Sequence, residues 1–322
     1  MARQRKGRRT NFVCLLYCVS KPNSYKSACG FFGYLFLYFY NVLTKLRIKT
    51  IRLTFRFRCD NLYSGIKMEI NAKIKKLKEI IDDSFNIVFF GGAGVSTESG
   101  VPDFRSKDGL YNNRGVKFEK YPPEYLLSHG CITNEPEVFF EFYRQKMDTR
   151  NVKPNAAHYF LADLEKTGKL KAVITQNIDG LHQKAGSKTV YELHGTTLRN
   201  YCAKCGKRYS DNFVFDSTAP VPLCPVCGGT VRCDVTLYEE ALPEQAVNGA
   251  INAIANADAL IIGGTSLTVY PAASFIRYFR GKHLVVINKD PLSLQLDPKK
   301  DLEINAPIGE VFSTLNALND RH

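Results

Sequence analysis

The chain has 322 residues and a formal net charge of +13. Its length is enough to bury a full core in one large or two modest domains. The charge is confined to residues 1–67, which hold 14 Lys and Arg against a single acidic residue, Asp60, while residues 68–322 hold 30 basic and 30 acidic residues. Since a nucleic-acid-binding body needs a basic surface, the neutral body argues against that class of protein.

Residues 1–67 also differ from the body in hydropathy. Ser27–Thr44 is a run of 18 residues without a charge, flanked by Lys26 and Lys45. Such a run is a marginal membrane span or signal anchor, and no small-residue cleavage site follows it. Three interpretations stay open: a dispensable extension with synthesis starting at Met68, a membrane anchor, and a disordered tail. We expect a cytoplasmic protein, or one anchored through residues 27–44.

The body begins with the pattern of an amphipathic helix over 69–83. Five aliphatic residues recur there at helical spacing in a background of Lys and Glu: Ile70, Ile74, Leu77, Ile80 and Ile81. The apolar run 86–90 then enters a glycine turn, as a buried strand would.

Further along the body, helix-like and strand-like stretches alternate. Helices are expected over 135–149, 155–167, 241–256 and 308–318, and strands over 171–175, 258–264 and 283–288. This alternation predicts an α/β fold, a Rossmann-like parallel sheet with helices on both faces and its ligand at the carboxyl ends of the strands. The domains expected are the extension 1–67 and a catalytic domain 68–322, into which a small module of about 200–233 is inserted.

That inserted module carries two close pairs of cysteines. Cys202 and Cys205 form one pair and Cys224 and Cys227 the other, with 18 residues between the pairs. Four thiolates at this spacing are typical of a tetrahedral zinc site, and with no open position the zinc is structural. Paired knuckles of this kind also indicate metal rather than disulfides, and a reducing compartment.

The glycine turn after the first strand departs from a dehydrogenase fingerprint. That fingerprint needs a third glycine where this chain has Thr97, and an acidic residue near position 112, where it has Asn112 and Asn113. Gly92-Ala93-Gly94 can still bring backbone N–H groups close to a phosphate. The turn therefore predicts a nucleotide site without predicting hydride transfer.

Three more polar turns follow predicted strands: TQNID (175–179), GGTSL (263–267) and INKD (287–290). Gln176, Asn177 and Asp179 lie in the turn TQNID, and GGTSL (263–267) offers small residues and hydroxyls to a phosphate or ribose. His194 in ELHG is a candidate general base, because the pKa of imidazole lies near neutrality.

The run SGVPDFR (99–105) closely resembles the signature of the sirtuins, NAD-dependent protein deacylases, in their bacterial-type form. The resemblance continues in order through TQNIDGLHQKAG (175–186), ELHGT (192–196), the paired cysteines, GGTSLTVYPA (263–272) and Asn288. It covers essentially all of 68–322 and none of 1–67.

The resemblance implies a role for each matching residue. His194 is the catalytic base, Gln176 and Asn177 contact the nicotinamide ribose, and Phe104, Ile178 and Asp179 line the nicotinamide pocket. Asn288 is expected at the adenosine ribose and Ile308 near the adenine. The other residues expected to contact NAD are Ala93, Thr97, Arg105, His194, Gly264, Thr265 and Ser266.

The family also suggests where a substrate peptide binds. The usual stretch R-P-D-V-V-x-F-G-E adds the peptide as an extra strand, and it reads RCDVTLYEE (232–240) here. Val235, Leu237 and Tyr238 are the expected contacts; Cys, Thr, Tyr and Glu replace Pro, Val, Phe and Gly. A branch that prefers acidic acyl groups has Tyr-x-x-Arg, whereas this chain has Tyr143 followed by Lys146, which favours acetyl-lysine.

The reaction implied is deacetylation of protein lysines, in which NAD is consumed, nicotinamide is released and the acetyl group passes to ADP-ribose. The partners implied are acetyl-lysine proteins, with no nucleic acid, and a membrane only through residues 1–67. Two alternatives stay open: a protein mono-ADP-ribosyltransferase, and a non-enzymatic zinc-ribbon that binds nucleic acid.

Overall fold

The computed structural model describes residues 67–319. The chain divides into two units, 1–72 and 73–322, and the features below belong to the second unit. The expectations for the extension, including the candidate span 27–44, lie outside the described residues. Within 67–319, no helix combines the length and apolarity needed to cross a membrane.

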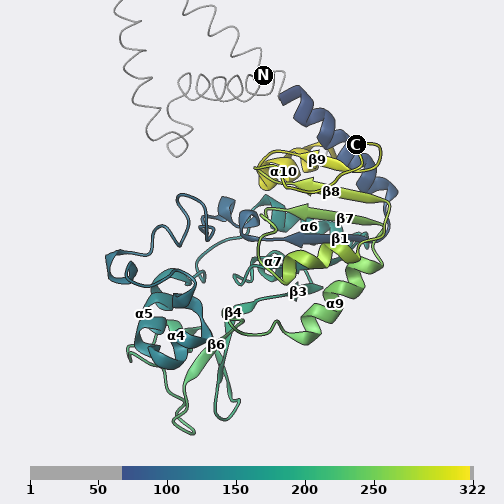
Figure 1. The fold of residues 1–322 in the computed structure, drawn as a ribbon. Coiled ribbons are helices and arrows are strands. Elements are labelled where there is room, and N and C mark those ends of the chain that lie inside the picture. The colour runs from purple at the N-terminus through teal and green to yellow at the C-terminus, as the bar shows by residue number, and fades with distance from the viewer. Residues whose placement is uncertain (1–66, 320–322) are drawn as a thin grey trace, which may run out of the picture. The chain divides into compact units, whose positions relative to one another are not determined.

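A six-stranded parallel sheet forms the centre of the larger half of the molecule (Figure 1). Its strands lie in the order β3-β2-β1-β7-β8-β9, so the order reverses between β1 and β7. That reversal is the switch point at which open α/β sheets bind ligands, and the predicted Rossmann-like sheet is confirmed. The strands are β1 (Ile87–Gly91), β2 (Leu170–Thr175), β3 (Val190–Glu192), β7 (Ala259–Gly263), β8 (His283–Ile287) and β9 (Leu302–Ile304).

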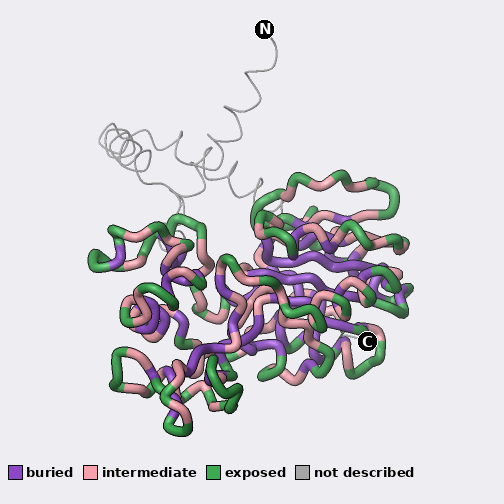
Figure 2. The backbone as a smooth tube through the Cα atoms, turned by 60° about the horizontal axis from the view of Figure 1, so that its bottom comes forward, coloured by how far each residue is buried: buried purple, intermediate pink, exposed green. Residues whose placement is uncertain are grey.

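Helices cover both faces of this sheet because alternate residues of its strands point to opposite sides. Val88 and Phe90 pack with residues of α9 (Glu244–Ala255) and the 3-10 helix η5 (Ala272–Tyr278). On the other side, α6 (Ala156–Lys166) packs against α10 (Ile308–Asn319), with the rings of Phe160 and Phe312 stacked at 4.4 Å. Figure 2 shows the buried strands running through the middle of this half.

The smaller half contains a three-stranded antiparallel sheet, β5-β4-β6, packed beside short helices. Tyr143 is fully buried there and stacks on Phe139 and Phe215 at 5.7 and 5.3 Å. The bounds of its elements are β4 (Gly195–Cys202), β5 (Arg208–Ser210), β6 (Val231–Val235), α4 (His129–Asn134), α5 (Pro136–Lys146) and α8 (Asn212–Phe215).

Several expected elements differ from the structure at their ends. The helix expected over 241–256 begins only at Glu244, because Pro243 has an extended backbone and a proline disfavours the helical conformation of the residue before it. The helix expected over 135–149 ends at Lys146, and the residues that follow form a turn in which Arg150 pairs with Asp148 at 2.7 Å. The short helix α4, β9 and η5 were not expected, since short irregular segments have no clear periodicity.

Candidate functional site

The glycine turns after β1 and β7 lie against each other at the switch point. Gly91 is the register partner of Gly263, and the N–H of Gly94 donates to the carbonyl of Gly264 at 2.8 Å. A Cβ on Gly94 would lie 2.8 Å from the Gly264 Cα, and Gly264 has a φ of +58°. The two backbones can approach this closely only because side chains are absent.

Ser96 connects the first glycine turn to the polar turn after β2. Its hydroxyl donates to Asp179 Oδ2 at 2.7 Å and accepts from Asn177 Nδ2 at 3.0 Å. Asp179 is buried, and burial raises the pKa of its carboxyl, while hydrogen bonds from Leu181 and Ser96 oppose that effect. The arrangement gives Asn177 and Asp179 fixed orientations before any ligand binds.

Gln176 occupies the centre of the site. Its backbone carbonyl accepts a hydrogen bond from His194 Nδ1 at 2.9 Å, and its side-chain Nε2 donates to Thr265 Oγ1 at 3.1 Å. Its N–H donates to the carbonyl of Gly91 at 3.0 Å. Gln176 therefore joins β1, the end of β2, the β3–β4 connection and the turn after β7.

His194 has a defined tautomer. A carbonyl oxygen can only accept, so Nδ1 carries the proton and Nε2 presents a lone pair. Burial lowers the pKa of His194, and the bond to Gln176 only partly opposes this, so the imidazole is neutral at pH 7. A neutral imidazole with a free Nε2 can accept a proton.

The remaining predicted NAD contacts lie at the same ends of the strands. Thr265 is buried and bonded to Gln176, and Ile308 Cδ1 packs so close to Gly263 that a Cβ there would clash. Asn288 directly follows β8, whose Ile287 carbonyl accepts from the N–H of Gly264 at 3.1 Å. Ala93, Thr97 and Ser266 lie in the two glycine turns themselves.

Phe104 and Arg105 lie in the loop after the first glycine turn. Phe104 packs on the same hydrophobic cluster as Ile178 and Tyr238, and its ring meets that of Tyr111 edge-on at 5.5 Å. Arg105 is exposed, with Nη2 donating to the Tyr238 hydroxyl at 3.3 Å.

The segment predicted to receive a peptide follows β6. Val235 and Leu237 are buried and Tyr238 is partly buried. The N–H of Tyr238 donates to the carbonyl of Leu127, and its carbonyl accepts from His129 N–H, both at 3.0 Å. Glu239, where the family pattern has Gly, has a φ of +76°, and its Oε2 accepts from the N–H of Gly130 at 2.8 Å.

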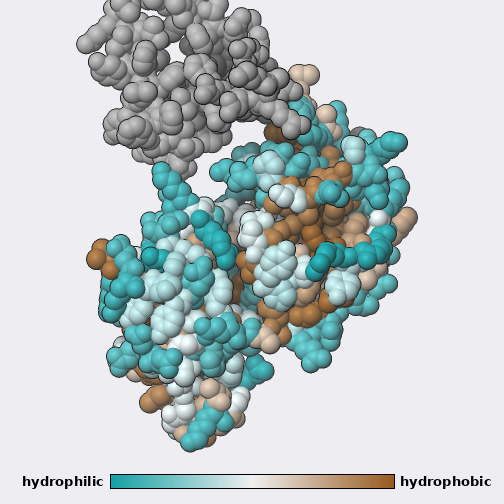
Figure 3. Space-filling model, in the orientation of Figure 1, coloured by the Kyte–Doolittle hydropathy of each residue, from teal (hydrophilic) through white to brown (hydrophobic). Residues whose placement is uncertain are grey.

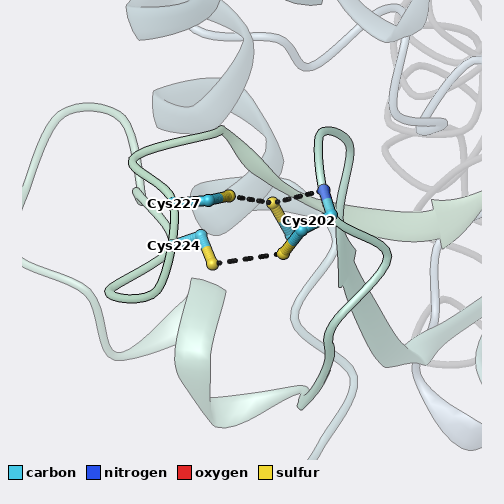
Figure 4. Close-up of side chains that lie close together, drawn as sticks. Cys202, Cys224 and Cys227 are labelled. Atoms are coloured by element: carbon cyan, nitrogen blue, oxygen red, sulfur yellow. Dashed lines mark hydrogen bonds between the residues drawn. The ribbon is translucent and has the colours of Figure 1, made fainter.

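The four predicted zinc cysteines come together at the tip of the small sheet. Figure 4 shows three of them, Cys202, Cys224 and Cys227, with their sulfurs turned toward one another. Their sulfurs lie within 4.8 Å of one another, with Sγ–Sγ distances of 3.4 Å for Cys202–Cys227 and 3.7 Å for Cys205–Cys224. Thiolates bound to one tetrahedral zinc are about 3.8 Å apart, so the cluster fits a structural zinc ion. Cys131 and Cys233 are buried and do not belong to the cluster.

The sequence did not reveal several residues that hold the first glycine turn and its neighbours in place. Asn155 caps α6 and donates through Nδ2 to Val95 O at 2.7 Å and Ser99 Oγ at 3.0 Å, which fixes the first glycine turn. His158 completes a capping box with Asn155. The signal was the pattern Asn-x-x-His before an apolar run, a variant of the capping box. Ser96 and Tyr111 had no comparable signal.

A cavity of about 510 Å³ lies in the smaller half and shares no residue with the site described above. It is lined by the loop 216–219 together with Asn212, Phe213 and 221–223. In Figure 3 apolar side chains gather instead over the half that holds the parallel sheet, whereas polar residues cover most of the visible smaller half.

Comparison with known proteins gives consistent matches. The model of the Sir2 family matches residues 92–271. An NAD-dependent protein deacetylase of Clostridium perfringens is 59% identical over 245 residues, which are 76% of this chain and 98% of that protein. One from Clostridium acetobutylicum is 55% identical over 243 residues, with the same two coverages.

Solved structures agree with these matches. A Sir2 protein with a deacetylated p53 peptide and 3′-O-acetyl-ADP-ribose is 34% identical, with a TM-score of 0.67 over 76% of this chain and 98% of that one. A Sir2 bound to an acetylated peptide is 33% identical, with a TM-score of 0.67 over 77% and 99%. The chain therefore belongs to the Sir2 family and is an NAD-dependent protein deacetylase.

Proposed function

We propose that the polar turns after β1, β2 and β7 hold NAD and that His194 is the general base for deacetylation of protein lysines. The hydrogen bond between His194 Nδ1 and the Gln176 carbonyl supports this most directly, because it joins the base to the turn assigned to the nicotinamide ribose. A phosphate suits these glycine turns because small residues after a strand let backbone N–H groups approach it. A Cβ at Gly92 or Gly94 would collide with Thr265 or Gly264 and force the two turns apart.

When bound, NAD supplies an electrophilic ribose carbon and nicotinamide as the leaving group. Asn177 and Asp179, held by Ser96, offer a carboxamide fixed polar partners, and Ile178 and Phe104 give the apolar walls. His194 Nε2 then takes a proton from a ribose hydroxyl, so that this oxygen can receive the acetyl group. The acetyl-lysine carbonyl oxygen displaces nicotinamide at that ribose carbon, and one water is consumed to release the amine. The products are the free lysine, nicotinamide and acetyl-ADP-ribose.

The acyl group that best suits this site is acetyl. A receptor for an acidic acyl group needs an accessible tyrosine hydroxyl and a cation, and Tyr143 is fully buried between Phe139 and Phe215. Lys146 Nζ donates to the carbonyl of Asn113 at 2.8 Å. Neither the buried Tyr143 hydroxyl nor the Lys146 ammonium group, which is bonded to the backbone, is therefore available to bind a carboxylate. The protein substrates are acetyl-lysine proteins, and a cytoplasmic location stays a proposal.

The test is turnover of acetyl-lysine and succinyl-lysine peptides by residues 68–322, with His194→Ala as the catalytic variant. We expect NAD-dependent deacetylation matched by nicotinamide release, a rate loss on the order of 10²–10⁴ in the variant, and slow turnover of the succinyl peptide. Full activity of a folded His194→Ala variant would contradict the assigned base. Preference for succinyl-lysine would contradict the acyl assignment.

A further inference from the structure

Two hydroxyls and a guanidinium meet between the proposed peptide segment and the loop after the first glycine turn. The hydroxyls of Tyr238 and Tyr111 lie 2.7 Å apart, a hydrogen bond that either can donate. Arg105 Nη2 donates to the Tyr238 oxygen at 3.3 Å. Tyr111 is only 6% exposed, so its hydroxyl depends on this contact for a partner.

Tyr238 is held firmly enough to act as an anchor. Its backbone bonds to the carbonyl of Leu127 and the N–H of His129 fix it beside α4. Arg105, by contrast, is an exposed side chain on a loop, with its guanidinium carbon 5.7 Å from the centre of the Tyr111 ring. Holding such a side chain in one orientation before binding lowers the entropy cost that a ligand would otherwise meet.

The family pattern has Phe at the position of Tyr238, and a Phe ring has no oxygen to accept from Arg105. We propose that Tyr238 is a positioning residue, which orients Arg105 for NAD through its hydroxyl. This inference rests on the proposed function, in which Arg105 contacts NAD. It makes Tyr238 a determinant of NAD affinity in a segment that otherwise serves the peptide.

The experiment compares Tyr238→Phe, Tyr111→Phe and the double variant in the full chain. Tyr238→Phe frees Arg105 and leaves the buried Tyr111 hydroxyl without a partner. We expect the KM for NAD to rise about 3- to 10-fold with a smaller change in kcat, the range that one hydrogen bond supplies, together with a lower melting temperature. Tyr111→Phe keeps the Arg105–Tyr238 bond, so its KM for NAD stays within about 2-fold.

The double variant separates orientation from folding. Both hydroxyls are gone, so the melting temperature should recover, while the KM for NAD stays raised because Arg105 still lacks its acceptor. Recovery of the KM as well would overturn the proposal, since the effect would then come from the orphaned Tyr111 hydroxyl. Tyr159→Phe, an exposed tyrosine on α6, is the matched control and should change neither quantity.

Arg105→Ala distinguishes this proposal from the one on which it rests. A raised KM for NAD in Arg105→Ala with an unchanged KM in Tyr238→Phe would refute the positioning role alone. An unchanged KM in Arg105→Ala would refute the assignment of Arg105 to NAD, and with it the inference.

Discussion

Gly94 and Gly264 are bonded backbone to backbone, N–H to carbonyl at 2.8 Å, although 170 positions separate them in the sequence. Each belongs to a turn that leaves one of the central strands of the sheet, and neither residue has a side chain that would hold the two turns apart. The end of the sheet proposed to hold NAD is therefore set by contacts between two glycine turns, and their spacing is sensitive to a single methyl group.

Replacing Gly264 with Ala should disrupt this contact. The new Cβ would lie 2.4 Å from Val95 N, at a φ of +58° that L-residues avoid. We expect a loss of about 3 kcal/mol or more in unfolding free energy, and little NAD-dependent deacetylation in the protein that remains folded. Urea unfolding and nicotinamide release measure the two effects.

Gly100→Ala is a matched control for that variant. Gly100 also has a positive φ, of +89°, but a Cβ there meets nothing within 4 Å. Only the backbone cost of about 1–2 kcal/mol should appear. Equal losses in the two variants would show that close approach of the turns is unimportant.

Removal of the proposed zinc should unfold the tip of the small sheet. Zinc would join the Cys202/Cys205 turn to the Cys224/Cys227 turn through four strong bonds, and without the ion weaker contacts such as the 3.4 Å contact between the Cys202 and Cys227 sulfurs remain. We expect the protein to bind one zinc ion, and both a chelator and Cys227→Ser to lower the melting temperature and the zinc content. Cys131→Ala, a buried thiol outside the cluster, should keep its zinc. Unchanged zinc content in Cys227→Ser would contradict the assignment.

The sequence was most informative where a pattern has one physical cause. Strands β1, β2, β7 and β8 were found within a residue or two, because buried parallel strands are continuous apolar runs. The cysteine cluster followed from spacing alone, since only nearby thiolates can share a metal. The family resemblance, rather than periodicity, supplied the roles proposed for Gln176 and His194.

Other features depend on contacts that local sequence does not encode. Ser96 bonds Asp179 across 83 positions, and Tyr238 reaches Arg105 across 133. No periodicity or turn rule predicts which hydroxyl will meet which partner after folding, since the packing of the whole chain decides it. The same holds for the pairing of Asn155 with the glycine turn.

Two buried histidines should make stability depend on pH. The rings of His158 and His182 lie 4.7 Å apart, both almost fully buried; burial lowers the pKa of His158 to about 4 and that of His182 in the same direction. A histidine with a lowered folded-state pKa binds protons mainly when unfolded. The free energy of unfolding is thus highest above about pH 6.5 and decreases as the pH drops toward 4. The decrease due to His158 is about 3 kcal/mol.

The variant that isolates this effect is His158→Gln. A glutamine can still accept from the N–H of Asn155, as His158 Nδ1 does at 3.2 Å, but it does not titrate. Urea unfolding between pH 4.5 and 7.5 should show a shallower dependence than in the unsubstituted protein. If the two pH profiles have the same slope, His158 is not the group responsible.

Glu239 should tolerate the residue that its family pattern has. Its φ of +76° costs a non-glycine residue about 1–2 kcal/mol, and the hydrogen bond from Gly130 N–H at 2.8 Å offsets about as much. Glu239→Gly loses both the strain and the bond, so the unfolding free energy should change by less than about 1 kcal/mol. Glu239→Ala keeps the strain and loses the bond, and should be less stable by about 1–2 kcal/mol. Urea unfolding of the unsubstituted protein and the two variants measures their order of stability. An Ala variant as stable as the others would show that the carboxylate contributes nothing to this left-handed turn.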